Sequence, residues 1–174
     1  GQLHRVHRRT YCLTMNPDHY AAFRAAPLFS HLDEATVQLL GGVMGERMVA
    51  PGPLLRQGDP GDTLLVLVSG SLTVSYQPDR GPSVHVDDVS PGEVLGELSC
   101  CDPAPLAASV HATEPSVVYV LDRTMLTALK KNAPQLASGL YNGIILCVSE
   151  RSRKLEARIL ASAGPLRRLG ARVS

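Results

Sequence analysis

Short apolar runs separated by turn-forming residues fill the chain from residue 44 to residue 121, and this alternation constrains the fold more than any other feature. The runs are spaced at roughly eight to twelve residues. They read GERMVAP, PLLRQ, TLLVLVSG, SLTVSYQ, SVHVDDV, LAASVHA and SVVYVLD. Tight turns are predicted at 58–61 and 69–71, and a hairpin loop at 78–82. The pattern predicts an antiparallel sandwich or barrel.

Helical segments precede this β region. Asn16 is the expected N-cap of a first helix, PDHYAAFRAA, with Pro17 at its first helical position and a stop before the next proline. Asp33 is expected to open a second helix over EATVQLL, which should end at the glycine pair 41–42.

Helical patterns return after the β region. Asp122 is the expected N-cap of a helix over DRTMLTALKKN, and Lys130 and Lys131 lie in its last turn, where cations oppose the helix dipole. Pro134 then starts a long helical segment.

Residues in this long segment follow a strict 4-3-4-3 spacing, which is the heptad pattern of a two-helix seam interrupted by two serines. The members are Tyr141, Ile145, Val148, Ser152, Leu155, Ile159, Ser162 and Leu166. The segment is longer than a helix needs to cover a barrel, so the sequence favours a homodimer joined through this helix. The alternative is a helix folded back on its own barrel.

Composition is that of a globular protein. The 174 residues allow one domain with extensions, and 44% of them are hydrophobic. The apolar runs at 64–68 and 143–148 are much shorter than the roughly eighteen residues that span a bilayer. The start of the chain lacks the basic and apolar regions of a secretory signal. We therefore expect no contact with a membrane.

The cysteines predict a reducing compartment. Cys12, Cys100, Cys101 and Cys147 show no metal spacing, and the adjacent pair is a poor candidate for an ordinary disulfide. Free thiols and a cytoplasmic location are expected. The adjacent pair is read as two small residues in a turn, with a redox-reactive pair as the alternative.

Charge is distributed unevenly along the chain. Residues 15–148 carry a net charge of −7, whereas residues 1–14 carry +3 and residues 149–174 carry +5. An acidic body with basic ends indicates an anionic partner or the association of ends with bodies. A solvated basic helix is the simpler alternative.

The order of helices, β region and long helix, together with specific turns, resembles the cyclic-nucleotide-binding domain family over about residues 27–160. PLFSHLDEATVQLL is similar to the family's entry helices, and LLRQGDPGDTLLVLVSGSLTV to its glycine-punctuated hairpin. SPGEVLGELS is similar to the start of its phosphate-binding cassette. The resemblance implies a catabolite-activator-like β-roll whose ligand is cyclic AMP or cyclic GMP; no other cofactor and no metal are expected.

The resemblance also implies a ligand site. In the family, a glutamate binds a ribose hydroxyl, helix amides face the phosphate, and a later arginine pairs with the phosphate. Gly96, Glu97 and Leu98 match the start of this cassette, but the arginine position falls on Leu106, which Ala107 and Ala108 follow. Those six are the candidate ligand residues. A second role remains open for the glutamate, since an acidic residue stabilises the first turn of a helix without any ligand.

Loss of the arginine should weaken phosphate binding strongly. Hydrogen bonds to a charged group contribute about 1.5–3 kcal/mol, and unpairing a buried charge costs roughly 3–5 kcal/mol. A micromolar site would then become millimolar. Arg56 and Arg80 are the replacements considered, although neither is close to Leu106 in the sequence.

The sequence lacks the patterns of an enzyme or a DNA-reading module. His85 and His111 stand alone, and no catalytic triad, carboxylate pair or P-loop stands out. About a dozen residues follow position 160, too few for a helix-turn-helix. We expect neither catalysis nor sequence-specific nucleic-acid binding. Weak phosphate contact remains open for Arg167, Arg168 and Arg172.

The expected fold class is mainly β with flanking helices: an antiparallel β-roll or jelly-roll barrel followed by a long C-terminal helix. Residues 1–14 are interpreted as a flexible arm, either native or left over from cloning. Residues 15–132 hold the entry helices, β-roll and hinge helix, 133–164 the dimerisation helix and 165–174 a basic tail. The favoured function is a dimeric, non-enzymatic regulatory or interaction domain with a degenerate pocket and an unidentified partner protein. The alternative is a working sensor of cyclic AMP, cyclic GMP or another small molecule with an atypical phosphate contact.

Overall fold

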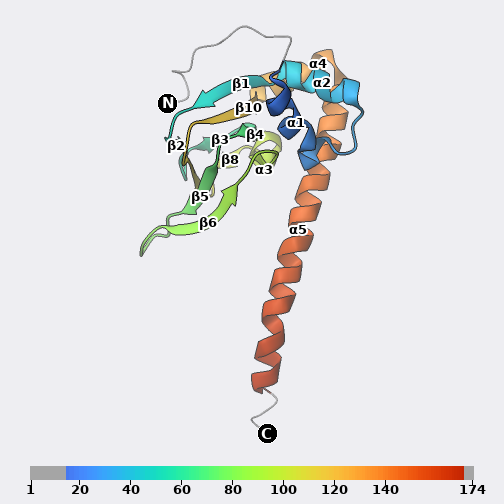
Figure 1. Cartoon of the computed structure of the whole chain (residues 1–174). Coiled ribbons are helices and arrows are strands. Elements are labelled where there is room, and N and C mark those ends of the chain that lie inside the picture. Colours follow the sequence, from blue (N-terminus) through green and yellow to red (C-terminus); the bar gives the residue numbers. More distant parts are fainter. Residues whose placement is uncertain (1–14, 171–174) are drawn as a thin grey trace.

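The computed structural model describes residues 15–170, with side chains to residue 161, and it confirms the predicted fold class (Figure 1). Its helices are α1 (Pro17–Ala25), the 3-10 turn η2 (Pro27–Phe29), α2 (Glu34–Val43), α3 (Glu97–Cys101), α4 (Arg123–Asn132) and α5 (Pro134–Gly170). Its strands are β1 (Gly45–Val49), β2 (Gly52–Leu55), β3 (Pro60–Gly61), β4 (Thr63–Ser69), β5 (Leu72–Tyr76), β6 (Val84–Val89), β7 (Val94–Leu95), β8 (Ala104–Pro105), β9 (Ser109–Ala112) and β10 (Ser116–Asp122). The predicted arm at 1–14 and positions 171–174 of the predicted tail lie outside the described residues.

Side-chain caps fix the starts of three helices, as predicted. The carboxylate or amide oxygens of Asn16, Asp33 and Asp122 each accept a hydrogen bond at 2.8 Å from a backbone amide in the first turn of α1, α2 and α4. Each cap satisfies one of the amides that a helix start leaves unpaired. The predicted end of α2 was wrong by a residue: the helix continues through the glycine pair to Val43.

The seven predicted apolar runs form the seven longer strands of the roll. Two four-stranded antiparallel sheets have the orders β1-β10-β4-β7 and β2-β9-β5-β6, and the short strands β3 and β8 pair with each other. The hairpin predicted at 78–82 joins β5 to β6, which pair antiparallel.

Strand β4 is buried on both of its faces, and it joins the two cores of the molecule. Leu64 and Val66 pack in the cluster that includes the N-terminal helices and α5. Leu65 and Leu67 pack in the cluster between the two sheets. Because side chains alternate along a strand, one apolar run supplies both cores.

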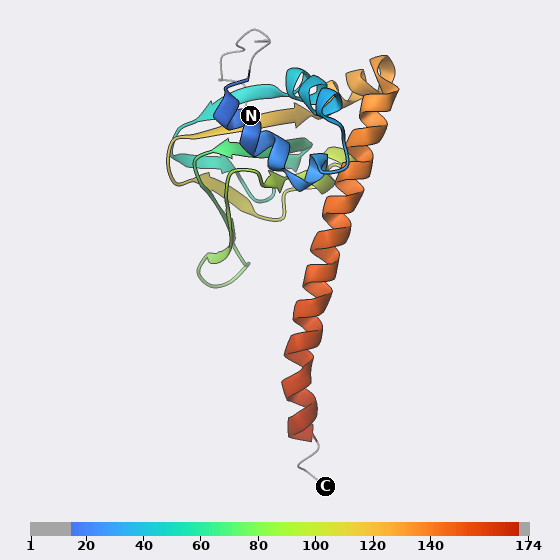
Figure 2. The same ribbon diagram turned by 45° about the vertical axis from the view of Figure 1, so that its right-hand side comes forward.

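The buried residues of helix α5 lie in its first turns. Ala137, Leu140 and Ile144 are buried in the core cluster that also contains residues of η2 and α4. Every described residue from 150 to 161 is exposed, and the helix extends away from the roll (Figures 1 and 2). It continues to Gly170, past the predicted boundary at 164 and into the predicted basic tail. Among the described residues, no helix has both the length and the apolar character needed to cross a bilayer.

Glycine at position 143 allows α5 to lie directly on the backbone of η2. A Cβ atom built at Gly143 would overlap the carbonyl oxygen of Leu28, which cannot move aside as a flexible side chain could. Gly42 in α2 provides a contrast, because a Cβ atom there would meet no atom within 4 Å.

We expect Gly143→Ala to lower the free energy of unfolding by about 1–3 kcal/mol, because the added methyl group forces α5 off η2. Gly42→Ala is the matched control and should be neutral or stabilising by up to roughly 1 kcal/mol, since alanine is the better helix former. Urea unfolding followed by circular dichroism measures both. Equal stability of the two variants would contradict this account of the contact.

Candidate functional site

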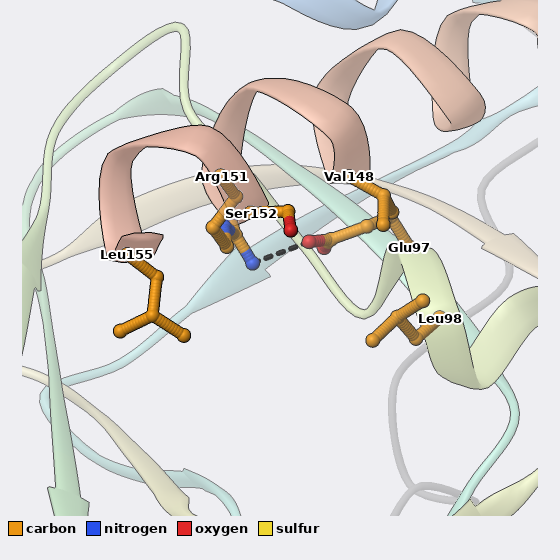
Figure 3. Close-up of a pocket in the computed structure, with 6 residues that line it drawn as sticks. All are labelled: Glu97, Leu98, Val148, Arg151, Ser152 and Leu155. Carbon is orange, nitrogen blue, oxygen red and sulfur yellow. Dashed lines mark hydrogen bonds and ion pairs between the residues drawn. The ribbon is translucent and has the colours of Figure 1, made fainter. Parts of the chain in front are cut away.

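A left-handed turn at Gly96 aims the following residue into the protein. Gly96 has φ of 78° and is the N-cap of α3 directly after β7. A Cβ atom there would overlap the carbonyl oxygen of Thr63, so both the conformation and the space require glycine. The turn makes Glu97 the first residue of α3, and its side chain enters the gap between α3 and α5 (Figure 3).

Glu97 is buried and paired with an arginine from the long helix. It is 2% exposed, and its Oε1 accepts a hydrogen bond from Nη1 of Arg151 (Figure 3). Nη2 of Arg151 also donates to the carbonyl oxygen of Val94 at 3.4 Å. A buried carboxylate without a partner would be costly, so this guanidinium neutralises the most buried charge of the site.

A small pocket lies between α3 and α5 around this ion pair. Its volume is about 210 Å³, and it is lined by Glu97, Leu98, Val148, Arg151, Ser152 and Leu155 (Figure 3). Apolar side chains form much of the wall, and the one carboxylate is already paired. Pockets for drug-sized ligands measure roughly 300–1,000 Å³, so this site offers limited space.

The second half of the predicted cassette lies beside α3 but outside the pocket lining, since Leu106 and Ser99 of α3 both face Gly61. Leu106 exchanges backbone hydrogen bonds of 2.8 Å with Gly58 and Asp59. Its Cδ2 atom would be 2.8 Å from a Cβ atom built at Gly61, so the side chain is directed at β3. Of the six predicted ligand residues, the pocket lining contains Glu97 and Leu98. The other four are Gly96, which shapes the turn, and Leu106, Ala107 and Ala108, which do not line it.

Comparison with known proteins agrees with this geometry. The family model described as a cyclic nucleotide-binding domain matches residues 50–132. A crystal structure of a cyclic nucleotide-binding domain from Methylobacillus flagellatus has 25% sequence identity and a TM-score of 0.71, covering 90% of this chain and 97% of that one. The chain belongs to the cyclic nucleotide-binding domain family.

Two relatives of this cyclic nucleotide-binding domain are regulators. The cAMP-dependent protein kinase regulatory subunit of Blastocladiella emersonii is 40% identical over 97 residues, which are 55% of this chain and 24% of that protein. The cyclic AMP receptor protein of Thermus thermophilus is 29% identical over 139 residues, 79% of this chain and 63% of that protein. The chain thus spans about a quarter of the kinase subunit and less than two thirds of the receptor.

Arg151 was not among the predicted site residues. It lies in the basic C-terminal region, and the candidate replacement cations in the sequence were Arg56 and Arg80. The cation that reaches Glu97 in the structure is Arg151. The sequence does place Arg151 one helical turn after Val148, a predicted seam residue. Spacing along the helix cannot show, however, that this arginine pairs with a residue 54 positions earlier.

The predicted seam residues divide into two groups. Tyr141 and Val148 are half-buried against their own domain, and the Lys130 ammonium lies 4.9 Å from the ring centre of Tyr141. Ile145, Leu155 and Ile159 are 60%, 58% and 57% exposed. Ser152 is exposed at the pocket rim. The first turns of α5 therefore fit the alternative of a helix folded on its own barrel. The predicted seam residues further along the helix are exposed, and the dimer stays a prediction.

The described part of the chain carries little other candidate chemistry. No group of three or more His, Cys, Asp or Glu side chains could hold a metal ion there. His85 forms an exposed pair with Asp88 at 2.9 Å, and His111 is an exposed residue of β9. Side chains of Arg167, Arg168 and Arg172 lie outside the described residues, so their predicted phosphate contact stays a prediction.

Burial raises the pKa values of the three described cysteines. The pKa of Cys100, in α3, rises to about 11, mainly because burial disfavours its thiolate. Burial also raises the pKa values of Cys101 and Cys147. All three are free thiols.

We expect iodoacetamide to alkylate these cysteines slowly at pH 7.5, with Cys100 the slowest, because the thiolate is the reactive species and a raised pKa reduces its fraction. The rates should increase as the pH rises towards each pKa. Peptide mass spectrometry after timed alkylation at pH 7.5 and pH 9 measures them, with free glutathione as the control. Reaction of Cys100 faster than glutathione at pH 7.5 would instead support a redox-reactive pair.

Proposed function

We propose that this domain is a regulatory module that is not itself an enzyme and that binds cyclic nucleotide weakly or not at all. The observation that carries the proposal is the charge arrangement of the cassette. Its one buried carboxylate, Glu97, is neutralised by Arg151, and aliphatic Leu106 stands where the resemblance expects the counter-ion of the phosphate.

The pocket offers a phosphate little net attraction. An incoming cyclic phosphodiester would meet a guanidinium already paired with a carboxylate and a wall of Leu98, Val148 and Leu155. Hydrogen bonds to a charged group contribute about 1.5–3 kcal/mol, so their loss lowers the affinity by roughly ten- to a hundredfold or more. The limited volume of the pocket acts in the same direction.

The relatives support the regulatory half of the proposal. One is named as a kinase regulatory subunit and another as a cyclic AMP receptor. We infer that this domain likewise reports to a partner protein or to another part of a longer chain. The free thiols agree with the reducing environment of the cytoplasm.

Isothermal titration with cyclic AMP and cyclic GMP tests the proposal. We expect the wild-type chain to bind with a dissociation constant in the millimolar range or weaker. Leu106→Arg should tighten cyclic AMP binding about a hundredfold, because it restores a cation where the phosphate is expected.

Leu106→Met is the matched control for this substitution, since it keeps the size of the side chain and adds no charge; its affinity should stay weak. Thermal unfolding shows whether each variant retains the fold. A micromolar constant for the wild-type chain would refute the degenerate pocket and favour the sensor, with Arg151 as the atypical phosphate contact.

We also propose that two chains associate through the exposed stripe of α5. Ile145 and Leu155 are large apolar side chains more than half exposed on a helix that projects from its domain. Their burial against a second copy removes apolar surface from water, at about 25 cal/mol per Å². The heptad spacing matches the seam of a two-helix coiled coil.

The dimer should be visible as twice the mass of the chain in light scattering. Ile145→Asp and Leu155→Asp should each shift the equilibrium to the monomer, because a charge in a seam is desolvated without a partner. Leu146→Asp is the control, since Leu146 is also exposed but lies about a quarter turn away from the stripe. A monomeric wild-type chain would end the proposal.

A further inference from the structure

The Glu97–Arg151 ion pair is strongly asymmetric in its exposure to water. The glutamate side chain is 3% exposed, whereas that of the arginine is 63% exposed. Glu97 belongs to α3, whose position is fixed by the turn at Gly96 and by the roll. Arg151 belongs to a part of α5 that has no buried residue of its own. The glutamate is therefore enclosed by its surroundings, whereas most of the arginine side chain faces water.

The pair is also the ion pair that joins α5 to the rest of the domain in the described part of the chain. The buried apolar contacts of α5 end at Ile144, nearly two turns before Arg151. Within the described residues, the remaining ion pair of α5 joins Glu150 to Lys154 inside the helix itself. Within the described residues, Arg151 thus supplies the one ion pair between α5 and α3, and Cys147 and Val148 are the last half-buried apolar residues of α5.

We propose that this ion pair is an autoinhibitory latch, in which the chain's own guanidinium occupies the carboxylate of the pocket and fixes α5 against α3 until another hydrogen-bond donor replaces it. The inference rests on the proposed function, because it couples the cassette to α5 without requiring a tightly bound nucleotide. It gives Arg151 the role of a competitor of the ligand, not that of a contact to it.

The energetics of opening follow from the asymmetry. When the pair separates, the arginine passes into water, where it is already largely solvated. The glutamate would remain buried and unpaired, which is costly unless a donor takes the place of the guanidinium. A ligand hydroxyl is such a donor. The latch therefore stays closed by default and opens when a hydroxylated ligand enters the pocket.

Amide hydrogen exchange of the full chain, measured by NMR, tests the latch without any ligand. The amides of Cys100 and Asp102 report on α3, because they donate hydrogen bonds to the carbonyl oxygens of Gly96 and Leu98 at 3.0 and 2.8 Å. Arg151→Gln removes the charge that neutralises Glu97, and it should speed exchange of these two amides by about tenfold or more. Glu97→Gln should have a similar effect. Arg158→Gln, two turns further along nearly the same side of α5, is the control and should change nothing.

Core amides of β4 and β10 distinguish local opening from general loss of stability. They should exchange at the wild-type rate in the Arg151→Gln variant. Equal acceleration in the core and in α3 would mean that the pair only stabilises the fold, and unchanged exchange in α3 would mean that it holds nothing. Either result would overturn the latch.

Nucleotide affinity separates a competitor from a ligand contact. In the Leu106→Arg background, adding Arg151→Gln should tighten cyclic AMP binding several-fold, because Glu97 is released for the ribose. Weaker binding of the double variant would assign Arg151 to ligand contact and overturn the latch. If the Leu106→Arg variant binds cyclic AMP no better than the wild-type chain, Leu106 is not the cause of weak binding and the proposed function fails. The hydrogen-exchange experiment tests the latch independently of that result.

Discussion

A carboxylate that is almost completely buried has to be neutralised, and in this protein the neutralising group comes from a helix far along the chain. Glu97 is placed inside by a turn that only glycine can make, and Arg151 meets it from α5. Removing Arg151 would leave the charge of Glu97 buried and unpaired, which is costly, whereas the guanidinium of Arg151 is largely solvated. The pairing therefore joins α3, where the cassette of the family begins, to the long helix α5.

The same pairing accounts for the limited chemistry of the pocket. With Glu97 and Arg151 satisfied by each other, Leu98, Val148 and Leu155 supply the rest of the wall. Leu106 points at the backbone of β3 and adds no charge. This arrangement is the basis of our proposal that the domain keeps the fold of the family and binds an anion weakly.

Much of the fold could be predicted because its signals are local. The caps Asn16, Asp33 and Asp122 accept hydrogen bonds from amides two or three residues away. Strand β4 is a continuous run of apolar residues, which predicts a strand that is buried on both faces. The end of α2 was misplaced because packing carries the helix through two glycines. The ion pair was missed because 54 residues separate its partners, and only the folded chain brings a residue of α5 onto α3. The predicted seam was ambiguous for a related reason: one helix meets its own core first and solvent later.

The projecting half of α5 works as a lever arm. From Arg151 to Gly170 the helix is about 28 Å long, at 1.5 Å of rise per residue. A tilt of about 10° at the level of the cassette would displace the far end by about 5 Å, roughly one helical turn. A change confined to a few atoms beside α3 would thereby become a displacement of several ångströms at the far end of the helix.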